Sequence, residues 1–282
     1  MRKDIKYKEI ITRLTLENFD ILKKEYNLNH NAMLGLLNYG LHNKAISEDK
    51  KWVLNKLKYK YQFSLVLKDS KYGIISDTHI GNIKDSPHYI KKSTNLLVQI
   101  GINKVFHTGD ILDSYDERCD LTHDELIKLH YQQIERFHDI WPINITTYAI
   151  LGNHDTKFKR LGIDLYKELS RDRFIILGTG GAYLKCSNYK IFLEHNVPTS
   201  ALVPPHYNYD LILKGHSHFF KYKENRNIFR VASCSNIQPN SYSLGYYAPG
   251  FATLSTTNGL VIDGYNFTKD ETVHTLTLKI KD

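Results

Sequence analysis

Residues 72–79 read YGIISDTH, a short apolar run that ends in an aspartate and a histidine one residue apart. A run of this length, with two isoleucines, predicts a buried strand over Tyr72–Ser76. Asp77 and His79 then follow at its carboxyl end. Side chains alternate along an extended chain, so both would point to one side, where they could bind a shared metal ion.

The same arrangement recurs farther along the chain. Strands are predicted over Lys104–His107, Thr146–Leu151, Tyr189–Glu194 and Leu211–Lys214. The clusters that follow them are Gly109-Asp110, Gly152-Asn153-His154-Asp155, His195, and Gly215-His216-Ser217-His218. Their carboxylate, imidazole and amide groups suit manganese, iron, zinc and similar ions. The neighbouring glycines let a turn take positive φ and let a phosphate come close. A metal site is therefore expected where the strands end.

The surrounding pattern predicts a mixed α/β (α+β) domain. Residues 87–102 and 122–140 have helical spacing, and Thr122 with Glu125 forms a capping box at the start of the second helix. Strands alternating with helices are typical of an α/β domain whose site lies at the carboxyl ends of its strands. Strand-like runs follow at 228–232, 250–256, 259–267 and 273–280, and the last three are expected to close the sheet in antiparallel fashion.

The first 62 residues differ from residues 63–282 in pattern and charge. Helical spacing is found over 6–26, 32–42 and 48–60, and a strand-like run begins at Gln62. Residues 1–71 hold 15 Lys and Arg against 8 Asp and Glu, whereas the rest of the chain is nearly neutral. This basic helical segment is either a helix-turn-helix-like module or a packing and oligomerisation appendage. Its charge favours an anionic partner such as nucleic acid, or reflects a solvated lysine-rich surface.

Bulk properties point to a cytoplasmic protein. The N-terminus MRKDIKYKEIITRL has no long apolar region of the kind found in secretory signals. No apolar stretch approaches the roughly 18 residues that a membrane span needs. The three cysteines are far apart and form no CxxC pair, so neither a disulfide framework nor a structural zinc site is expected. The sequence does not specify an oligomeric state, and a dimer is one possibility.

The series DTH, GD, GNHD, H and GHSH, over roughly residues 72–220, resembles the calcineurin-like metallophosphoesterase superfamily. That resemblance implies a β-sandwich flanked by helices, with two metal ions at its edge. It implies that Asp77, His79 and His218 bind one ion, that Asn153, His195 and His216 bind the other, and that Asp110 bridges them. The ions would be manganese foremost, with iron, zinc, nickel or magnesium as alternatives.

The resemblance also implies catalytic residues. His154 matches the histidine that contacts the substrate phosphate or protonates the leaving group, and Asn153 is a further substrate contact. Asp113, in GDILD, would orient and charge His154, although Asp155 competes for that role. The assignment of His195 as a metal ligand depends only on its position at the end of a predicted strand. His206, in a proline-rich stretch, is the alternative ligand.

Departures from the protein-phosphatase pattern narrow the range of expected substrates. No arginine follows Asp113, and the later motif is GNHD rather than GNHE. The pattern is closer to exonucleases and phosphodiesterases, so hydrolysis of phosphodiesters in DNA or RNA is expected. Small or cyclic nucleotides are the alternative substrates, and a non-catalytic nucleic-acid-binding protein is the other alternative.

Two further segments could contact the substrate. Tyr115 and Arg118, in the insert Ser114–Thr122, are candidate phosphate contacts, although the insert also fits a plain loop. Residues 233–251 weakly resemble the stretch after the last metal motif of exonuclease-like members. Tyr242, Tyr246 and Tyr247 in that stretch could stack on bases, or could be ordinary loop and core tyrosines.

Overall fold

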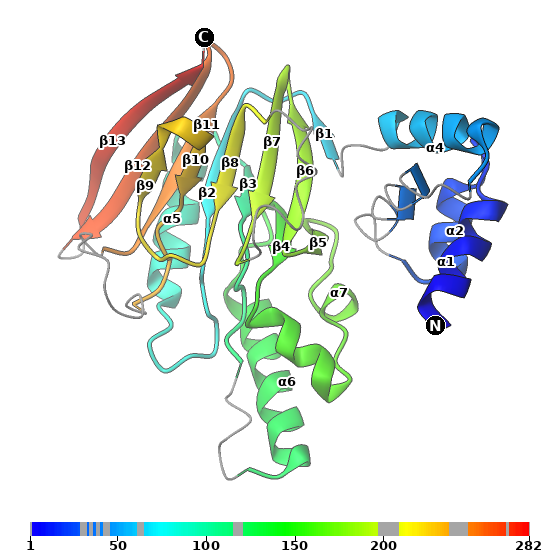
Figure 1. The fold of residues 1–282 in the computed structure, drawn as a ribbon. Helices are drawn as coiled ribbons and strands as arrows, with labels where there is room; N and C mark the ends of the chain where they lie inside the picture. Colours follow the sequence, from blue (N-terminus) through cyan, green and yellow to red (C-terminus); the bar gives the residue numbers. More distant parts are fainter. Residues whose placement is uncertain are drawn as a thin grey trace. The chain divides into compact units, whose positions relative to one another are not determined.

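A computed structural model of the 282-residue chain describes residues 2–28, 33, 36–37, 40–41, 46–60, 65–114, 121–196, 209–236, 248–268 and 271–281. The chain divides into two compact units, residues 1–65 and residues 66–282 (Figure 1). This division lies close to the boundary predicted at 62/63. Among the described residues, no helix has the length and apolarity needed to span a membrane.

The N-terminal unit is helical. Its helices are α1 (Arg2–Arg13), α2 (Phe19–Glu25) and α4 (Glu48–Lys60). The predicted helix over 6–26 is in fact two helices. Asn18 accepts a hydrogen bond from the Thr15 backbone N–H at 2.7 Å and donates one to the Arg13 carbonyl at 2.8 Å. These side-chain bonds compete with the helical ladder and break the helix.

The larger unit contains two β-sheets. The seven-stranded sheet has the order β13-β12-β11-β2-β3-β4-β5, and the six-stranded sheet has the order β1-β6-β7-β8-β10-β9 (Figure 1). The strands of the first sheet are β2 (Lys71–Ile75), β3 (Lys104–His107), β4 (Thr146–Leu151), β5 (Phe174–Thr179), β11 (Gly250–Ser255), β12 (Leu260–Thr268) and β13 (Glu271–Lys281). Those of the second are β1 (Leu65–Leu67), β6 (Gly181–Cys186), β7 (Tyr189–Glu194), β8 (Leu211–Lys214), β9 (Lys221–Lys223) and β10 (Ile228–Arg230).

Helices cover one face of the seven-stranded sheet. Strands β2 to β5 are parallel, and α5 (Pro87–Gln99) and α6 (His123–Ile140) lie on the connections between them. Ile90 and Leu97 of α5 and Phe137 of α6 share an apolar core with Ile75 and Val105 of the sheet. The short elements η1 (Asp155–Leu161), α7 (Leu165–Glu168) and η2 (Glu224–Arg226) complete the unit.

The opposite face of this sheet packs toward the six-stranded sheet. By alternation along β2, Tyr72 and Ile74 point away from the helices, and both are fully buried. Tyr72 stacks on Phe106 at a centroid separation of 4.8 Å. Burial raises the pKa of the Cys186 thiol of β6 to about 12, with Tyr72 as its hydrogen-bonding neighbour. The predicted β-sandwich flanked by helices is confirmed.

Candidate metal centre

All seven predicted metal ligands lie where strands of the two sheets end. In the seven-stranded sheet, the parallel strands β2, β3 and β4 end just before Asp77, Asp110 and Asn153. In the six-stranded sheet, the parallel strands β7 and β8 end just before His195 and the His216-Ser217-His218 segment. Since parallel strands share a carboxyl edge, the fold gathers these residues into one site.

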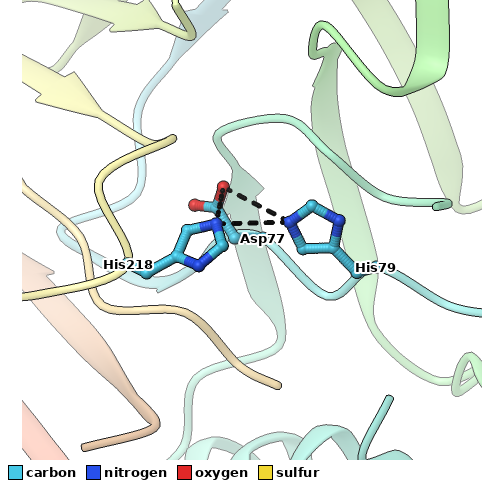
Figure 2. A group of neighbouring side chains, drawn as sticks. All are labelled: Asp77, His79 and His218. Carbon is cyan, nitrogen blue, oxygen red and sulfur yellow. Dashed lines mark hydrogen bonds and ion pairs between the residues drawn. The ribbon is translucent and has the colours of Figure 1, made fainter. Parts of the chain in front are cut away.

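The first group of side chains consists of Asp77, His79 and His218, all buried (Figure 2). The Nε2 atoms of the two histidines are 3.3 Å apart. Asp77 Oδ1 lies 3.3 Å from His218 Nε2 and 3.9 Å from His79 Nε2. Burial alone would raise the pKa of Asp77, but the hydrogen bond and charge of His218 outweigh it and hold this pKa well below its usual range.

The second group consists of Asp110, His195 and His216. His195 Nε2 lies 3.0 Å from Asp110 Oδ2 and 3.1 Å from the side-chain oxygen of Asn153. The rings of His195 and His216 meet edge to face at 5.3 Å. Burial disfavours a charged His195, but the carboxylates of Asp110 and Asp77 outweigh it and raise its pKa to about 9. A metal ion would therefore compete with a proton for His195 Nε2.

Asp110 lies between the two groups. Its Oδ2 is 3.0 Å from His195 Nε2 and 3.8 Å from His79 Nε2. Its Oδ1 accepts a hydrogen bond from the His154 backbone N–H at 2.9 Å. Among the described residues, the buried Oδ2 has no hydrogen bond of normal geometry, and the 3.0 Å contact with His195 Nε2 can supply one only when that nitrogen carries a proton. A buried carboxylate oxygen without a donor is costly unless a cation compensates it.

Hydrogen bonds orient two of the imidazoles. His195 Nδ1 donates to the Thr108 carbonyl at 2.7 Å, so Nε2 is the nitrogen that faces the site. His79 Nδ1 faces Asp113 Oδ1 at 3.2 Å and likewise directs Nε2 inward. A carboxylate or carbonyl behind a histidine is the usual support of a metal-binding imidazole, because it fixes the tautomer and the ring orientation.

The backbone that carries these ligands differs from the predicted extended one. Strand β2 ends at Ile75 and β8 at Lys214, so the ligands lie on loops. Left-handed φ values occur at Asp77 (50°), His79 (44°), Asp110 (52°), His216 (71°) and His218 (59°). Such conformations cost of order 1–3 kcal/mol each in non-glycine residues and are concentrated at functional sites. Local backbone strain, rather than strand alternation, directs these side chains to one point.

Glycines let the loops close around His195. A Cβ at Gly152 would lie 2.2 Å from Asp110 Oδ1 and 2.8 Å from the His195 ring. A Cβ at Gly215 would lie 2.6 Å from the Thr108 carbonyl and 2.7 Å from His195 Nδ1. These positions exclude any side chain because Asp110, His195 and Thr108 occupy the space.

His154 lies beside the first group, and Asp113 is its carboxylate partner. Asp113 Oδ1 is 2.7 Å from His154 Nδ1 and 3.2 Å from His79 Nδ1. Burial lowers the pKa of His154, but Asp113 and Asp110 outweigh this effect and raise it overall. Burial would raise the pKa of Asp113, but its hydrogen bonds with His154 and His79 outweigh this effect and hold the pKa well below its usual range.

Asp155, the competitor for this role, points elsewhere. It accepts backbone N–H bonds from Ile111, Leu112 and Gly152 at 2.8–3.1 Å. Burial and the neighbouring Asp110 raise its pKa to about 6. The structure therefore places Asp113, and not Asp155, against His154, while Asp155 ties the Gly152 turn to the Asp110 loop.

Several supporting residues carried no recognisable signal in the sequence. The Ser76 hydroxyl donates to Asp77 Oδ2 and accepts from Thr108 Oγ1 at 2.6 Å. His107 is fully buried, and its Nδ1 accepts from the Gly109 N–H at 3.2 Å, so its Nε2 donates to Thr78 Oγ1 at 3.1 Å. Burial lowers the pKa of His107 to about 3, which keeps this ring neutral. His107 thus links the loops that carry Asp77 and Asp110.

The remaining candidates fall outside the described residues. They are Tyr115 and Arg118, the possible stacking residues Tyr242, Tyr246 and Tyr247, and His206, the competitor of His195. His195 itself lies within the site, 0% exposed at its side chain.

The gathered side chains fit two divalent ions. Within each triad the candidate ligand atoms lie no more than 4.8 Å from one another. Asp110 reaches both triads, and its buried Oδ2 has no hydrogen bond of normal geometry among the residues described. A mixed set of carboxylate, imidazole and amide donors accepts manganese, iron, zinc and related ions.

Comparison with known proteins places the site in a family. The calcineurin-like phosphoesterase superfamily domain matches residues 71–248, more than half of the chain. No curated protein sequence matches. Three similar solved structures are YfcE, a phosphoesterase from E. coli, zinc-bound Vps29 from Entamoeba histolytica, and the nuclease MPE from Pseudomonas putida.

These structures have low sequence identity to the chain. For YfcE the identity is 17% and the TM-score 0.45, over 74% of this chain and 99% of that one. For Vps29 the values are 13% and 0.43, over 74% and 99%. For MPE they are 14% and 0.35, over 72% and 87%. With the domain match spanning the strands and loops that carry the metal centre, the chain belongs to the calcineurin-like phosphoesterase superfamily.

Proposed function

We propose that this chain hydrolyses phosphodiesters, foremost in DNA or RNA, at a pair of divalent ions of which manganese is the first candidate. The position of Asp110 carries the proposal, because one carboxylate reaches both histidine groups. Two ions bound there would neutralise phosphate charge and lower the pKa of a bound water. Asp77, His79 and His218 would hold one ion, and Asn153, His195 and His216 the other.

His154 supplies the protein's own contribution to the chemistry. Its side chain is 30% exposed, so a substrate can reach it. The Asp113 carboxylate at 2.7 Å favours the protonated ring, which can stabilise charge on phosphorus or donate a proton to the departing oxygen. The non-catalytic alternative would need a broken ligand set, whereas every predicted ligand is present in the site.

A substrate panel tests the proposal. Purified protein loaded with Mn²⁺ is expected to hydrolyse bis-p-nitrophenyl phosphate and single- or double-stranded DNA or RNA faster than a phosphomonoester. Turnover of cyclic nucleotides without any cleavage of polymers would favour the small-nucleotide alternative. If the loaded protein turned over neither diesters nor monoesters, the enzymatic proposal would be wrong.

The nucleic-acid part of the proposal also rests on the basic N-terminal segment. Some of its charge is already neutralised, because Arg13 forms a two-pronged ion pair with Glu25 at 2.5 and 2.7 Å. Lys24 remains exposed on α2. When a protein binds nucleic acid through such residues, its affinity falls as the salt concentration rises, because salt cations compete for the phosphates. On double-stranded DNA, the logarithm of the binding constant falls with the logarithm of the salt concentration, with a slope of about −0.9 per phosphate contact.

Deletion of residues 1–62 is therefore expected to weaken DNA binding and to flatten its salt dependence. Hydrolysis of bis-p-nitrophenyl phosphate should be retained, because all metal ligands lie beyond residue 76. The charge reversal Lys24→Glu should shift binding in the same direction with the chain otherwise intact. Fluorescence anisotropy across a salt series measures both, and an unchanged affinity after the deletion would contradict a role in binding.

A further inference from the structure

The segment between β2 and α5 contains a tightly built loop, residues 81–85, which begins two residues after His79 (Figure 1). Inside this 81–85 loop, Asp85 Oδ2 accepts the Gly81 N–H at 2.8 Å, and Asn82 Oδ1 accepts the Lys84 N–H at 2.8 Å. The Asn82 carbonyl accepts the Asp85 N–H at 2.9 Å. The loop thus has a defined conformation of its own.

Contacts with other elements hold the 81–85 loop in place. Arg136 of α6 forms a bidentate ion pair with Asp85 at 2.8 and 2.9 Å. The Asn236 N–H donates to the Lys84 carbonyl at 3.2 Å. Gly81 has φ of +96°, and a Cβ there would lie 2.3 Å from Gln133 Cγ of α6. Arg136 and Gln133 of α6, together with Asn236, therefore hold the loop against the domain.

At the tip of this fixed loop lies Ile83, which is 98% exposed. No other large hydrophobic side chain in the described part of the chain is as exposed, and the next is Ile143 at 77%. Lys84 beside it is also exposed. The other side chains of the loop are polar, so its tip presents a single apolar group next to a cation.

The loop is directly connected to the catalytic pair. Asn82 donates its side-chain amide to Asp113 Oδ2 at 2.5 Å, and its backbone N–H donates to the His79 carbonyl at 3.0 Å. Asp113 in turn contacts His154 at 2.7 Å. Ile83 therefore follows directly in the chain after Asn82, the residue that hydrogen bonds to Asp113 of the catalytic pair.

We propose that Ile83 packs against the base or sugar of a nucleotide next to the scissile phosphate, and that Lys84 pairs with a flanking phosphate. This inference rests on the proposed function and specifies its substrate contact. A nucleotide chain alternates apolar faces with anionic groups, which matches an apolar side chain beside a cation. A protein or a lipid surface would call for a larger apolar patch than this loop offers. Because its internal hydrogen bonds and the ion pair with Arg136 already order the loop, little conformational entropy is lost on binding.

The test compares Ile83→Ala with the native Mn²⁺-loaded full chain on a short oligonucleotide and on bis-p-nitrophenyl phosphate. The KM for the oligonucleotide should rise about tenfold, which corresponds to ~1.4 kcal/mol, while kcat changes little. Ile83→Leu, which keeps a large apolar side chain, should retain most of the native affinity for the oligonucleotide. Ile143→Ala is the matched control, because Ile143 is also exposed and lies just before the amino-terminal end of β4, whereas the metal centre lies at the carboxyl end. It should leave the KM and kcat for both substrates unchanged. Lys84→Gln should reduce the salt slope of oligonucleotide binding by about 1.

The outcomes separate this inference from the proposed function. Bis-p-nitrophenyl phosphate has no nucleotide to contact Ile83, so its turnover by Ile83→Ala should equal that of the native protein. An equal loss on both substrates would show that Ile83 acts through Asn82 and Asp113, and would overturn the inference. If Ile83→Ala cleaved the oligonucleotide with the same KM and kcat as the native protein, the inference would also be overturned, whereas the proposed function would stand. If the native protein turned over no diester at all, the proposed function would fail first.

Discussion

An Asp110→Asn variant is expected to lose at least one bound metal ion and to hydrolyse bis-p-nitrophenyl phosphate at least ~10³-fold more slowly than the native protein. Asp110 Oδ2 lies 3.0 Å from His195 Nε2 of one group and 3.8 Å from His79 Nε2 of the other. Asparagine has nearly the same shape and can keep the Oδ1 bond from the His154 N–H. The substitution therefore removes the bridging charge with little change in packing.

Metal content measured on the purified variant, together with the rate, tests this expectation. Mn²⁺ should also raise the melting temperature of the native protein more than that of Asp110→Asn, because only a bound ion stabilises the folded state. Asp210→Asn is the matched control, since Asp210 lies at the amino-terminal end of β8, where it binds Lys281. Full metal content and native turnover in Asp110→Asn would contradict the bridging assignment.

Much of the fold followed from the local pattern. The predicted strands at 104–107, 146–151, 189–194 and 211–214 have the observed bounds, because each is a short apolar run with abrupt polar ends. The Thr122 and Glu125 capping box is present as predicted, with the Glu125 N–H bonded to Thr122 Oγ1 at 3.3 Å. The three closing antiparallel strands are also confirmed. These features depend on residues that are neighbours in the chain.

The geometry of the site could not be predicted in the same way. Nothing in DTH or GHSH specifies left-handed backbone at His79 or His218, since such backbone is uncommon in non-glycine residues even though histidine tolerates it better than most. At His79 that conformation is held by a contact distant in sequence, the bond from the His79 N–H to the Asp110 carbonyl at 3.1 Å. The choice between Asp113 and Asp155 was likewise decided by tertiary contacts, because the backbone N–H groups that bind Asp155 come from residues 111, 112 and 152.

A His154→Ala variant is expected to keep both metal ions and to lose about 10²–10⁴ in kcat, the usual contribution of a positioned acid or base. The metal site should persist because His154 belongs to neither bridged triad, and its backbone N–H, which binds Asp110, is retained. The effect of Asp113→Asn is expected to be less confined to catalysis than that of His154→Ala, because Asp113 also contacts the proposed metal ligand His79. The double variant should therefore lose less than the sum of the two single effects, since both residues act as one unit.

The leaving group distinguishes the two roles open to His154. A sugar alkoxide needs a proton as it departs, whereas p-nitrophenolate leaves readily without one. If His154 donates that proton, His154→Ala should slow oligonucleotide cleavage far more than hydrolysis of bis-p-nitrophenyl phosphate. If it only stabilises charge on phosphorus, both substrates should lose rate to the same extent. Ser114→Ala, which removes only a 3.4 Å contact to His154 Nδ1, is the control and should change neither rate appreciably. Native rates on both substrates in His154→Ala would exclude either role, because the protonated ring held by Asp113 could then contribute to neither step.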